Sequence, residues 1–323
     1  MDVKQGKAAA IIGAGLIGRA WAMVFARAGW TARLTDSVPA QLSAARDLIA
    51  QSLDDQAQAG LAGDAPAALA RIEICPTLSA AVAGVQWVQE NLPENVDIKR
   101  GVFAELDRLA PAAAILASST SAIVASKFTA ELAGRARCLV AHPVNPPHLV
   151  PVVELCGSPW TDAATVSRAT EIMLSVGQVP VRVRREIDGF VLNRLQGALL
   201  TEAMRLVADG VISPDDLDKT VREGLGLRWS FMGPFATIEL NAPGGVADYC
   251  ARYSGFYRRL AADPPSPSVW EGESAGRVVA ALGQPIGPGE RERLMQWRDR
   301  RLLALRRHKM DRESLDGDET GNA

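Results

Sequence analysis

A glycine-rich turn near the start of the chain constrains the fold more than any other feature of the sequence. It spans residues 13–18, reads Gly-Ala-Gly-Leu-Ile-Gly, and follows the apolar run 8–12. The spacing Gly-x-Gly-x-x-Gly between a buried strand and a helix is typical of a turn that binds the pyrophosphate of a dinucleotide. The apolar spacing after the turn predicts a helix over 16–28, which Gly29 ends.

Each residue of this turn has a physical task. Gly13 permits the tight turn, Gly15 lets the backbone approach the pyrophosphate, and Gly18 lets the helix pack closely on the strand. The first helical residues, Leu16 and Ile17, present free backbone amides at the positive end of the helix dipole. We therefore expect all five residues to contact the cofactor.

An acidic residue at the end of the second strand indicates which dinucleotide binds. The strand predicted over 31–35 ends at Asp36, 18 residues after Gly18. Its carboxylate can accept hydrogen bonds from both ribose hydroxyls and would repel a 2′-phosphate, and the next residue is Ser37 rather than an arginine. The sequence therefore favours NAD over NADP, with a related fold for another nucleotide as the alternative.

Strands and helices alternate up to about residue 188, beyond which strand signals are few. This pattern predicts an α/β fold, a Rossmann-type doubly wound, mostly parallel sheet, followed by an all-helical domain. We expect an NAD-binding domain at 1–188, a helical substrate and dimerisation domain at 189–310, and a disordered tail at 311–323. Further strands are predicted at 85–89, 114–117, 138–141 and 150–155, and helices at 96–108, 124–133 and 190–209, with two more within 39–70.

The composition argues against several classes of partner. The net charge of −2 gives no excess of positive charge for nucleic acid or an anionic membrane, and no apolar run is long enough to span a bilayer. Three histidines and four cysteines without a Cys-x-x-Cys pair make a metal site unexpected. We expect a cytoplasmic protein with reduced thiols.

Four polar residues follow or occupy predicted strand ends and suggest a reaction. His142 lies at the end of one strand, and Glu154 lies twelve residues later on the next, so a tight return could bring the carboxylate beside the imidazole. Ser121 closes an upstream strand, and Asn193 begins the helical region. A Ser–His–Glu set could also serve a hydrolase, but no Gly-x-Ser-x-Gly elbow surrounds Ser121.

Three segments carry a resemblance to a known family. They are HPVNPP at 142–147, EIDGFVLNRLQ at 186–196 and GLGLRWSFMGP at 224–234. With the glycine turn they make nearly the whole chain resemble the 3-hydroxyacyl-CoA dehydrogenase superfamily. Within it, the sequence is most similar to the branch whose members oxidise L-gulonate. The resemblance implies an NAD-dependent enzyme that is a homodimer through its helical domain.

The same resemblance implies roles for the polar residues in oxidation of a hydroxyl group. His142 would take the hydroxyl proton as a general base, and Glu154 would hold the imidazole and stabilise its cationic form. Ser121 and Asn193 would hydrogen-bond the substrate oxygen. A neutral imidazole suits this proton transfer near neutral pH independently of the resemblance.

Three further positions match residues of the family that line the nicotinamide half of the cofactor. They are Glu94 and Lys99 in the PENVDIK run, and Asn145 in the HPVNPP run. Ser121 is expected to contribute here as well.

The sequence says less about the substrate. A relative that binds CoA should carry basic residues on the helices after the second strand, yet residues 37–70 contain one base, Arg46, and four aspartates. Arg228 follows a glycine-rich helix end and could bind a free carboxylate through its two-pronged guanidinium. A structural ion pair or a dimer contact are the alternatives for Arg228.

We therefore expect oxidation of the 3-hydroxyl of a small L-hydroxy acid, with L-gulonate as the first candidate. The alternatives are a short-chain (S)-3-hydroxyacyl-CoA and a carnitine-type or 3-hydroxybutyrate-type acid. A non-enzymatic alternative is a structural, crystallin-like role on the same fold.

Overall fold

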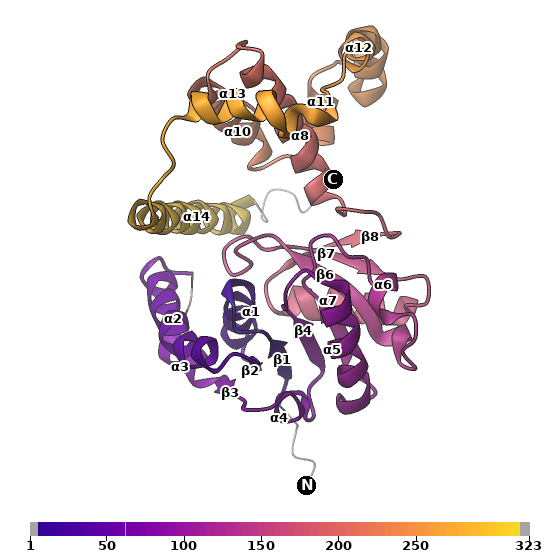
Figure 1. Cartoon of the computed structure of the whole chain (residues 1–323), viewed down its shortest axis with the longest axis vertical. Helices are drawn as coiled ribbons and strands as arrows, with labels where there is room; N and C mark the ends of the chain where they lie inside the picture. The colour runs from indigo at the N-terminus through magenta and orange to yellow at the C-terminus, as the bar shows by residue number, and fades with distance from the viewer. Residues whose placement is uncertain (1–5, 62, 317–323) are drawn as a thin grey trace. The chain divides into compact units, whose positions relative to one another are not determined.

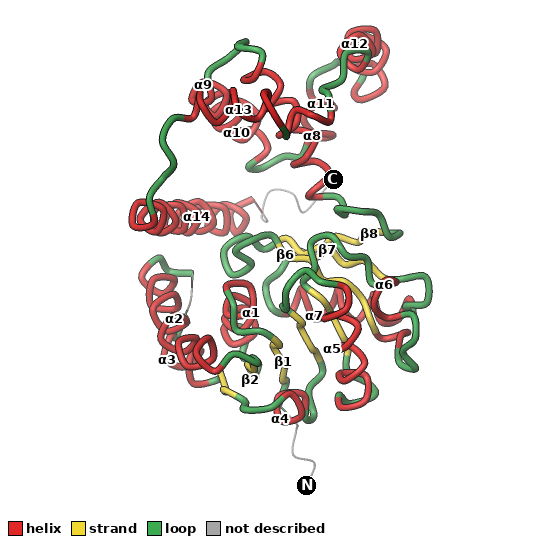
Figure 2. The backbone as a smooth tube through the Cα atoms, in the orientation of Figure 1, coloured by secondary structure: helices red, strands yellow, loops and turns green. Residues whose placement is uncertain are grey.

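A computed structural model describes residues 6–61 and 63–316, and the chain divides into two compact units (Figures 1 and 2). The first unit comprises residues 1–193 and 289–323, and the second comprises residues 194–288. The first is built on a sheet and the second is helical, which confirms the predicted fold class. Each unit is described by itself below.

The sheet of the first unit has eight strands in the order β3-β2-β1-β4-β5-β6-β7-β8. All neighbouring strands run parallel except the antiparallel pair of β6 and β7. The chain reverses its direction of travel across the sheet between β1 and β4, and ligands of such sheets bind beyond the carboxyl ends at this point. The strands are β1 Ala8–Ile12, β2 Thr31–Thr35, β3 Ile72–Ile74, β4 Trp87–Glu90, β5 Ile115–Ser118, β6 Cys138–Pro143, β7 Val152–Gly157 and β8 Val179–Val183.

Helices cover both faces of the sheet because its strands carry apolar side chains on both faces. In β1, Ala9 and Ile11 belong to one buried cluster, together with Trp21 and Phe25 of α1, whereas Ile12 belongs to a second cluster on the other face. The helices of this unit are α1 Leu16–Arg27, α2 Pro39–Gln58, α3 Ala65–Ala70, α4 Leu78–Val82, α5 Val96–Leu109, α6 Ser126–Thr129, α7 Ala163–Ser175 and α14 Pro288–Asp316.

The second unit consists of helices that begin with α8. Ser213 caps α9, since its hydroxyl accepts a hydrogen bond from the amide of Asp216 at 3.1 Å. A π-helical turn, Thr220–Leu225, carries the chain from α9 into α10. The helices are α8 Leu192–Ala208, α9 Pro214–Lys219, α10 Gly226–Trp229, α11 Pro234–Leu240, α12 Gly245–Ala261 and α13 Gly272–Leu282.

Two strands of the sheet were not predicted. β3 has only three residues, and β8 contains Pro180 and leaves Val179 and Val181 exposed, so neither has the run of buried apolar residues that marks a strand. Both lie at edges of the sheet. The helix predicted over 124–133 is shorter, since α6 spans only Ser126–Thr129.

The last helix, α14, belongs to the compact unit that contains the sheet. The expected helical domain at 189–310 included this helix, so the observed grouping differs from the expected boundary. Helix α14 also continues through residue 316, where a disordered tail from 311 was expected. Residues 317–323 of that tail lie outside the described residues. Among the described helices, none combines the length and apolar character needed to cross a bilayer.

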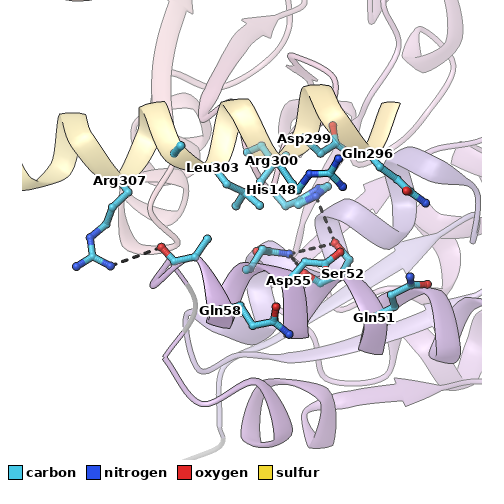
Figure 3. Close-up of a pocket in the computed structure, with 14 residues that line it drawn as sticks. Gln51, Ser52, Asp55, Gln58, His148, Gln296, Asp299, Arg300, Leu303 and Arg307 are labelled. Atoms are coloured by element: carbon cyan, nitrogen blue, oxygen red, sulfur yellow. Dashed lines mark hydrogen bonds between the residues drawn. The ribbon is translucent and has the colours of Figure 1, made fainter. Parts of the chain in front are cut away.

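Arginine side chains join α14 to the loop after β6. Arg306 donates hydrogen bonds to the carbonyl oxygens of His148 and Leu149 at 3.0 and 3.3 Å, and Arg27 of α1 donates to the same His148 carbonyl at 3.2 Å. Helices α2 and α14 and the His148 loop enclose a cavity of about 620 Å³ (Figure 3). The candidate catalytic residues do not line it.

His148 is buried beside this cavity among positive charges. Burial, and then the charges of Arg27, Arg306 and Arg298, lower its pKa from 6.5 to about 3. The ring therefore stays neutral in the folded protein near neutral pH. When unfolded, the same histidine takes up a proton below about pH 6.5. The free energy of unfolding consequently falls as the pH decreases from about 6.5 towards 3, because the unfolded chain binds the additional proton.

We expect His148→Phe to weaken this acid dependence, since phenylalanine fills the buried position without titrating. Between about pH 7.5 and about pH 5.5, the wild-type protein should lose about 1.4 kcal/mol more unfolding free energy than the variant. Urea titrations at both pH values measure the difference. Equal losses in the two proteins would mean that His148 does not stay neutral on folding.

Candidate active site

The carboxyl ends of four neighbouring strands bring the candidate residues to one edge of the sheet. Ile12 of β1 lies opposite Glu90 of β4, Glu90 lies opposite Ser118 of β5, and Ser118 lies opposite Val140 of β6. The glycine turn, the 91–94 loop, the 119–123 loop and His142 all follow or occupy these ends. The predicted phosphate turn and the predicted base therefore share one edge.

Three glycines of the phosphate turn meet different surroundings. Gly13 has a φ of 98°, and a Cβ there would lie 2.9 Å from the Asn91 carbonyl oxygen. A Cβ on Gly18 would lie 1.8 Å from the carbonyl oxygen of Gly13, so this position admits no side chain. For Gly15, no atom of the described residues lies within 4 Å of the corresponding point. The space beside Gly15 is open, as a turn that receives a pyrophosphate requires.

The amino end of α1 faces this open space. Among the described residues, no side chain caps the helix at Gly15, so the first amides, including those of Leu16 and Ile17, are left for a ligand. A negatively charged phosphate is favourable at such a helix end. The turn therefore fits a dinucleotide.

Asp36 lies beside the same turn. One carboxylate oxygen accepts a hydrogen bond from the Ala14 amide at 2.6 Å, and the other accepts one from the Val38 amide at 2.7 Å. Each oxygen has a second lone pair, so the carboxylate can still accept hydrogen bonds from a ribose. Asp36 thus also fixes the turn, which the sequence did not indicate.

His142 and Glu154 face each other across the antiparallel pair of β6 and β7. The two residues are register partners, and Nδ1 of His142 lies 2.8 Å from a carboxylate oxygen of Glu154. Both side chains are buried. The antiparallel return between the strands therefore brings the carboxylate beside the imidazole.

The second oxygen of Glu154 binds the amino end of α8. It accepts hydrogen bonds from the amides of Val191 and Leu192 at 2.8 and 3.0 Å. Burial alone would raise the pKa of this carboxyl, but the hydrogen bonds from His142 and the two amides outweigh it and hold the pKa below the ordinary value. Because an ionised carboxylate only accepts hydrogen bonds, Nδ1 of His142 donates, and Nε2 has no hydrogen-bond partner among the described residues.

Phe190 supports the imidazole from one side, and sequence reasoning missed it. Its ring centroid lies 5.6 Å from that of His142, and its side chain is fully buried. The backbone of Phe190 has a φ of 48°, in the left-handed region that residues other than glycine rarely adopt. Such strain is tolerated where surrounding contacts impose it, here beside the candidate base.

Ser121 and Asn193 lie next to each other. The side-chain amide of Asn193 donates a hydrogen bond to the Ser121 carbonyl oxygen at 2.9 Å. Ser121 itself is exposed, at the loop that follows β5. The structure thus brings these two residues together, and their contact with a substrate oxygen stays a prediction.

Glu94 binds the loop that carries Ser121. Its carboxylate accepts hydrogen bonds from the Thr120 hydroxyl and from the amides of Ala122 and Ile123, the latter two at 3.2 Å. Burial would raise the pKa of Glu94, but these hydrogen bonds and the charge of Lys99 hold it below its ordinary value.

Lys99 has different surroundings from those expected of a cofactor contact. Its ammonium group is fully buried and lies 3.0 Å from both carboxylate oxygens of Glu90. Neither Glu90 nor this ion pair was predicted, because nothing in the sequence indicates that the two side chains meet. A direct contact between Lys99 and the cofactor stays a prediction.

Two further predicted residues, Asn145 and Arg228, are exposed. Asn145 is exposed and follows β6, so its contact with the cofactor stays a prediction. Arg228 is exposed in the short helix α10 of the second unit. Asn91 was missed, although its side-chain amide donates a hydrogen bond to the Ile12 carbonyl oxygen at 3.2 Å and its backbone packs on Gly13.

Comparison with family models matches both units. The model described as the 3-hydroxyacyl-CoA dehydrogenase NAD binding domain matches residues 8–187, and the model for the C-terminal domain of the same enzymes matches residues 189–284. Together they cover most of the chain. The predicted cofactor, NAD, is confirmed by the first match.

Individual relatives cover nearly the full length. Lambda-crystallin of Oryctolagus cuniculus is 43% identical over 92% of this chain and 95% of its own length. L-carnitine dehydrogenase of Streptomyces griseus is 36% identical over 88% of this chain and 86% of its own. A solved NAD+-dependent 5-formyl-3-hydroxy-2-methylpyridine 4-carboxylic acid 5-dehydrogenase is 31% identical, with a TM-score of 0.80 over 94% of this chain and 98% of that one.

We expect the glycines of the turn to separate cofactor binding from stability. Gly18→Ala should lower the unfolding free energy by about 2 kcal/mol, because its Cβ overlaps a backbone carbonyl. Gly15→Ala should leave stability unchanged but weaken NADH binding by about tenfold or more, since the methyl group enters the phosphate space. Urea unfolding and NADH fluorescence titration measure the two effects.

Gly101→Ala is the matched control, because Gly101 lies in α5 and no atom of the described residues would contact its Cβ. The Gly101→Ala variant should lower neither the unfolding free energy nor the affinity for NADH. If Gly15→Ala bound NADH as tightly as the wild-type protein, the cofactor could not lie against this turn.

Proposed function

We propose that this chain, which belongs to the 3-hydroxyacyl-CoA dehydrogenase family of NAD-dependent oxidoreductases, oxidises the 3-hydroxyl group of a small L-hydroxy acid. L-Gulonate is the first candidate substrate, and its product would be 3-dehydro-L-gulonate. The observation that carries the proposal is the buried pair of His142 and Glu154, in which Nδ1 of the imidazole is held and Nε2 has no hydrogen-bond partner within residues 6–61 and 63–316.

The pair supplies what oxidation of an alcohol requires from the protein. Nε2 of His142 takes the hydroxyl proton, and the ionised Glu154 stabilises the resulting imidazolium. The amides of Val191 and Leu192 keep Glu154 in place during this transfer. NAD, when bound, accepts the hydride.

The substrate oxygen is oriented by Ser121 and Asn193 in this proposal. Asn193 fixes the backbone of Ser121 through its carbonyl oxygen, so the serine hydroxyl is presented from a held loop. The glycine turn, Leu16, Ile17 and Asp36 hold the adenosine half of the cofactor. Glu94 fixes the loop beside the nicotinamide half.

Two observations favour a free acid over a CoA thioester. Helix α2 carries one base, Arg46, and three aspartates, which suits the phosphates of CoA poorly. A relative named L-carnitine dehydrogenase is similar over most of the chain, and carnitine is a free hydroxy acid. The resemblance of the sequence motifs to L-gulonate 3-dehydrogenase selects L-gulonate among such acids. A short-chain (S)-3-hydroxyacyl-CoA is the second candidate, since the family models carry that name.

We also propose that the protein is a cytoplasmic homodimer that associates through its second unit. Large apolar side chains are exposed there, including Phe231, Phe235 and Leu240, each more than 70% exposed. Exposed apolar patches of this kind mark association surfaces. A purely structural, crystallin-like role is the less favoured alternative, because such a role would not need the buried His142–Glu154 pair.

The substrate is tested by measuring NADH formation with L-gulonate, L-carnitine, 3-hydroxybutyrate and 3-hydroxybutyryl-CoA in parallel. We expect the highest kcat/KM with L-gulonate. His142→Gln should lower kcat with the best substrate by about 100- to 10,000-fold, because the general base is removed, while NADH still binds.

A strong preference for the CoA thioester would overturn the choice of a free acid. Near-normal turnover of the His142→Gln variant would show that another group takes the proton. If no compound of the four were oxidised while NADH bound normally, the crystallin-like alternative would gain support.

A second experiment concerns Arg228, which we propose binds the carboxylate of the acid. Arg228→Met removes the charge and keeps the length of the side chain, so KM for the preferred free acid should rise by about tenfold or more with a smaller change in kcat. Arg222→Met, in the adjacent π-helical turn, is the control for loss of an exposed charge. An unchanged KM in the Arg228 variant would exclude this role.

A further inference from the structure

Three buried polar side chains form a cluster beneath the candidate active site. Glu90 and Ser118 are the last residues of β4 and β5 and lie opposite each other in the sheet, and Lys99 reaches them from α5. The side chain of Glu90 is fully buried, as is that of Ser118, and Lys99 is 1% exposed. Burial of this kind leaves the three groups to interact with one another rather than with water.

The carboxylate of Glu90 is the centre of the cluster. Nζ of Lys99 donates to both of its oxygens at 3.0 Å, and the Ser118 hydroxyl donates to it at 2.5 Å. The amide of Leu92 donates to it as well, at 2.6 Å. Four hydrogen bonds therefore converge on one carboxylate and fix its position.

The cluster reaches both loops of the site. The Leu92 amide belongs to the 91–94 loop, which carries Glu94, and Lys99 also donates weakly to the Leu92 carbonyl at 3.5 Å. The Ser118 hydroxyl accepts a hydrogen bond from the Thr120 amide at 3.2 Å, in the loop that carries Ser121. One group of side chains thus holds the base of two loops that come from different strands.

Stability alone does not account for this arrangement. Burying two charges costs solvation free energy, and a well-packed apolar pair is often as stable or more stable than a buried ion pair. An ion pair with directional hydrogen bonds instead specifies where the groups around it lie. Here those groups are backbone amides of the loops that carry Glu94 and Ser121.

We propose that the Glu90–Lys99 ion pair, together with Ser118, positions the 91–94 and 119–123 loops so that Glu94 and Ser121 meet cofactor and substrate in a reactive arrangement. In this proposal all three side chains act by positioning the loops, and for Lys99 this role replaces the direct cofactor contact that the family resemblance implies. Lys99 acts through Glu90, since its donors are directed at the Glu90 carboxylate and the Leu92 carbonyl. The role of the loops in catalysis rests on the proposed function.

Two variants test the proposal. Ser118→Ala removes one hydroxyl of the cluster, and the double variant Glu90→Gln/Lys99→Met removes both charges while keeping similar side-chain volumes. We expect each to lower kcat by roughly ten- to hundredfold, because small misplacements of reacting groups slow the reaction this strongly. The dissociation constant of NADH should stay within about twofold, since the glycine turn and Asp36 are untouched.

Amide hydrogen exchange provides a readout that needs no substrate. In both variants, the amides of Ala122 and Ile123 should exchange faster, although neither binds the altered side chains directly. Their partners are Glu94 and Thr120. Faster exchange at these remote amides shows that the loops have loosened.

Asp107→Asn is the matched control. Asp107 lies on the same helix as Lys99 and forms a largely buried ion pair with Arg137 at 2.9 Å, outside the two loops. It should lower stability without changing kcat or the exchange of Ala122 and Ile123.

The proposal is overturned if both cluster variants keep kcat within about twofold of the wild-type value, or if exchange of Ala122 and Ile123 is unchanged. It is also overturned if Asp107→Asn lowers kcat equally, because loss of stability would then explain the effect. Rates are measured with the acid that the wild-type protein oxidises fastest, so a wrong substrate assignment leaves the test intact. If the wild-type protein oxidised none of the acids, the proposed function would fail while the exchange experiment still decided whether the cluster holds the loops.

Discussion

The carboxylate of Glu154 is the interaction on which the rest of the site depends. It binds His142 through one oxygen and the amino end of α8 through the other. A buried carboxylate without partners would take up a proton rather than stay charged. The amides of Val191 and Leu192 make the charged form stable, and only that form fixes the imidazole with Nδ1 as donor. The amides of Val191 and Leu192 thereby help to fix the orientation of the His142 imidazole through Glu154.

Carboxylates recur along this edge for the same physical reason. Glu90 ends β4, Glu94 lies in the loop after it, and Glu154 lies within β7. Each carboxylate accepts hydrogen bonds from backbone amides of loops that lack partners in the sheet. An acceptor with two oxygens can bind several donors at once. These carboxylates therefore anchor the 91–94 loop, the 119–123 loop and the amino end of α8.

Much of this site could be predicted from the sequence because its signals are local. The glycine turn and Asp36 lie within one strand-helix-strand segment, and the pairing of His142 with Glu154 needs only a tight return between consecutive strands. Lys99 could not be placed in the same way, because its partner Glu90 becomes its neighbour only when α5 packs on the sheet. Phe190 was missed because no sequence signal marks a residue other than glycine in the left-handed region.

The fold shows the same division between local and long-range information. Strands with continuous buried runs were predicted within a few residues, whereas β3 and β8, which are short or exposed, were not. The expected helical domain at 189–310 included most of α14, so the unit on which this helix packs was not predicted. Arg306 joins α14 to the first unit by donating hydrogen bonds to backbone carbonyl groups of the loop after β6. The side chains of the accepting residues do not take part, so the sequence does not indicate this contact.

The buried charges also differ in how they respond to acid. Glu94 and Glu154 have lowered pKa values, so the stability they contribute is present above about pH 4.5 and is lost only as the pH falls through their values in the folded protein. His148 begins to oppose folding below about pH 6.5, because only the unfolded chain takes up its proton. Mild acid therefore acts first on the His148 loop and α14, while the Glu154 charge that holds His142 persists.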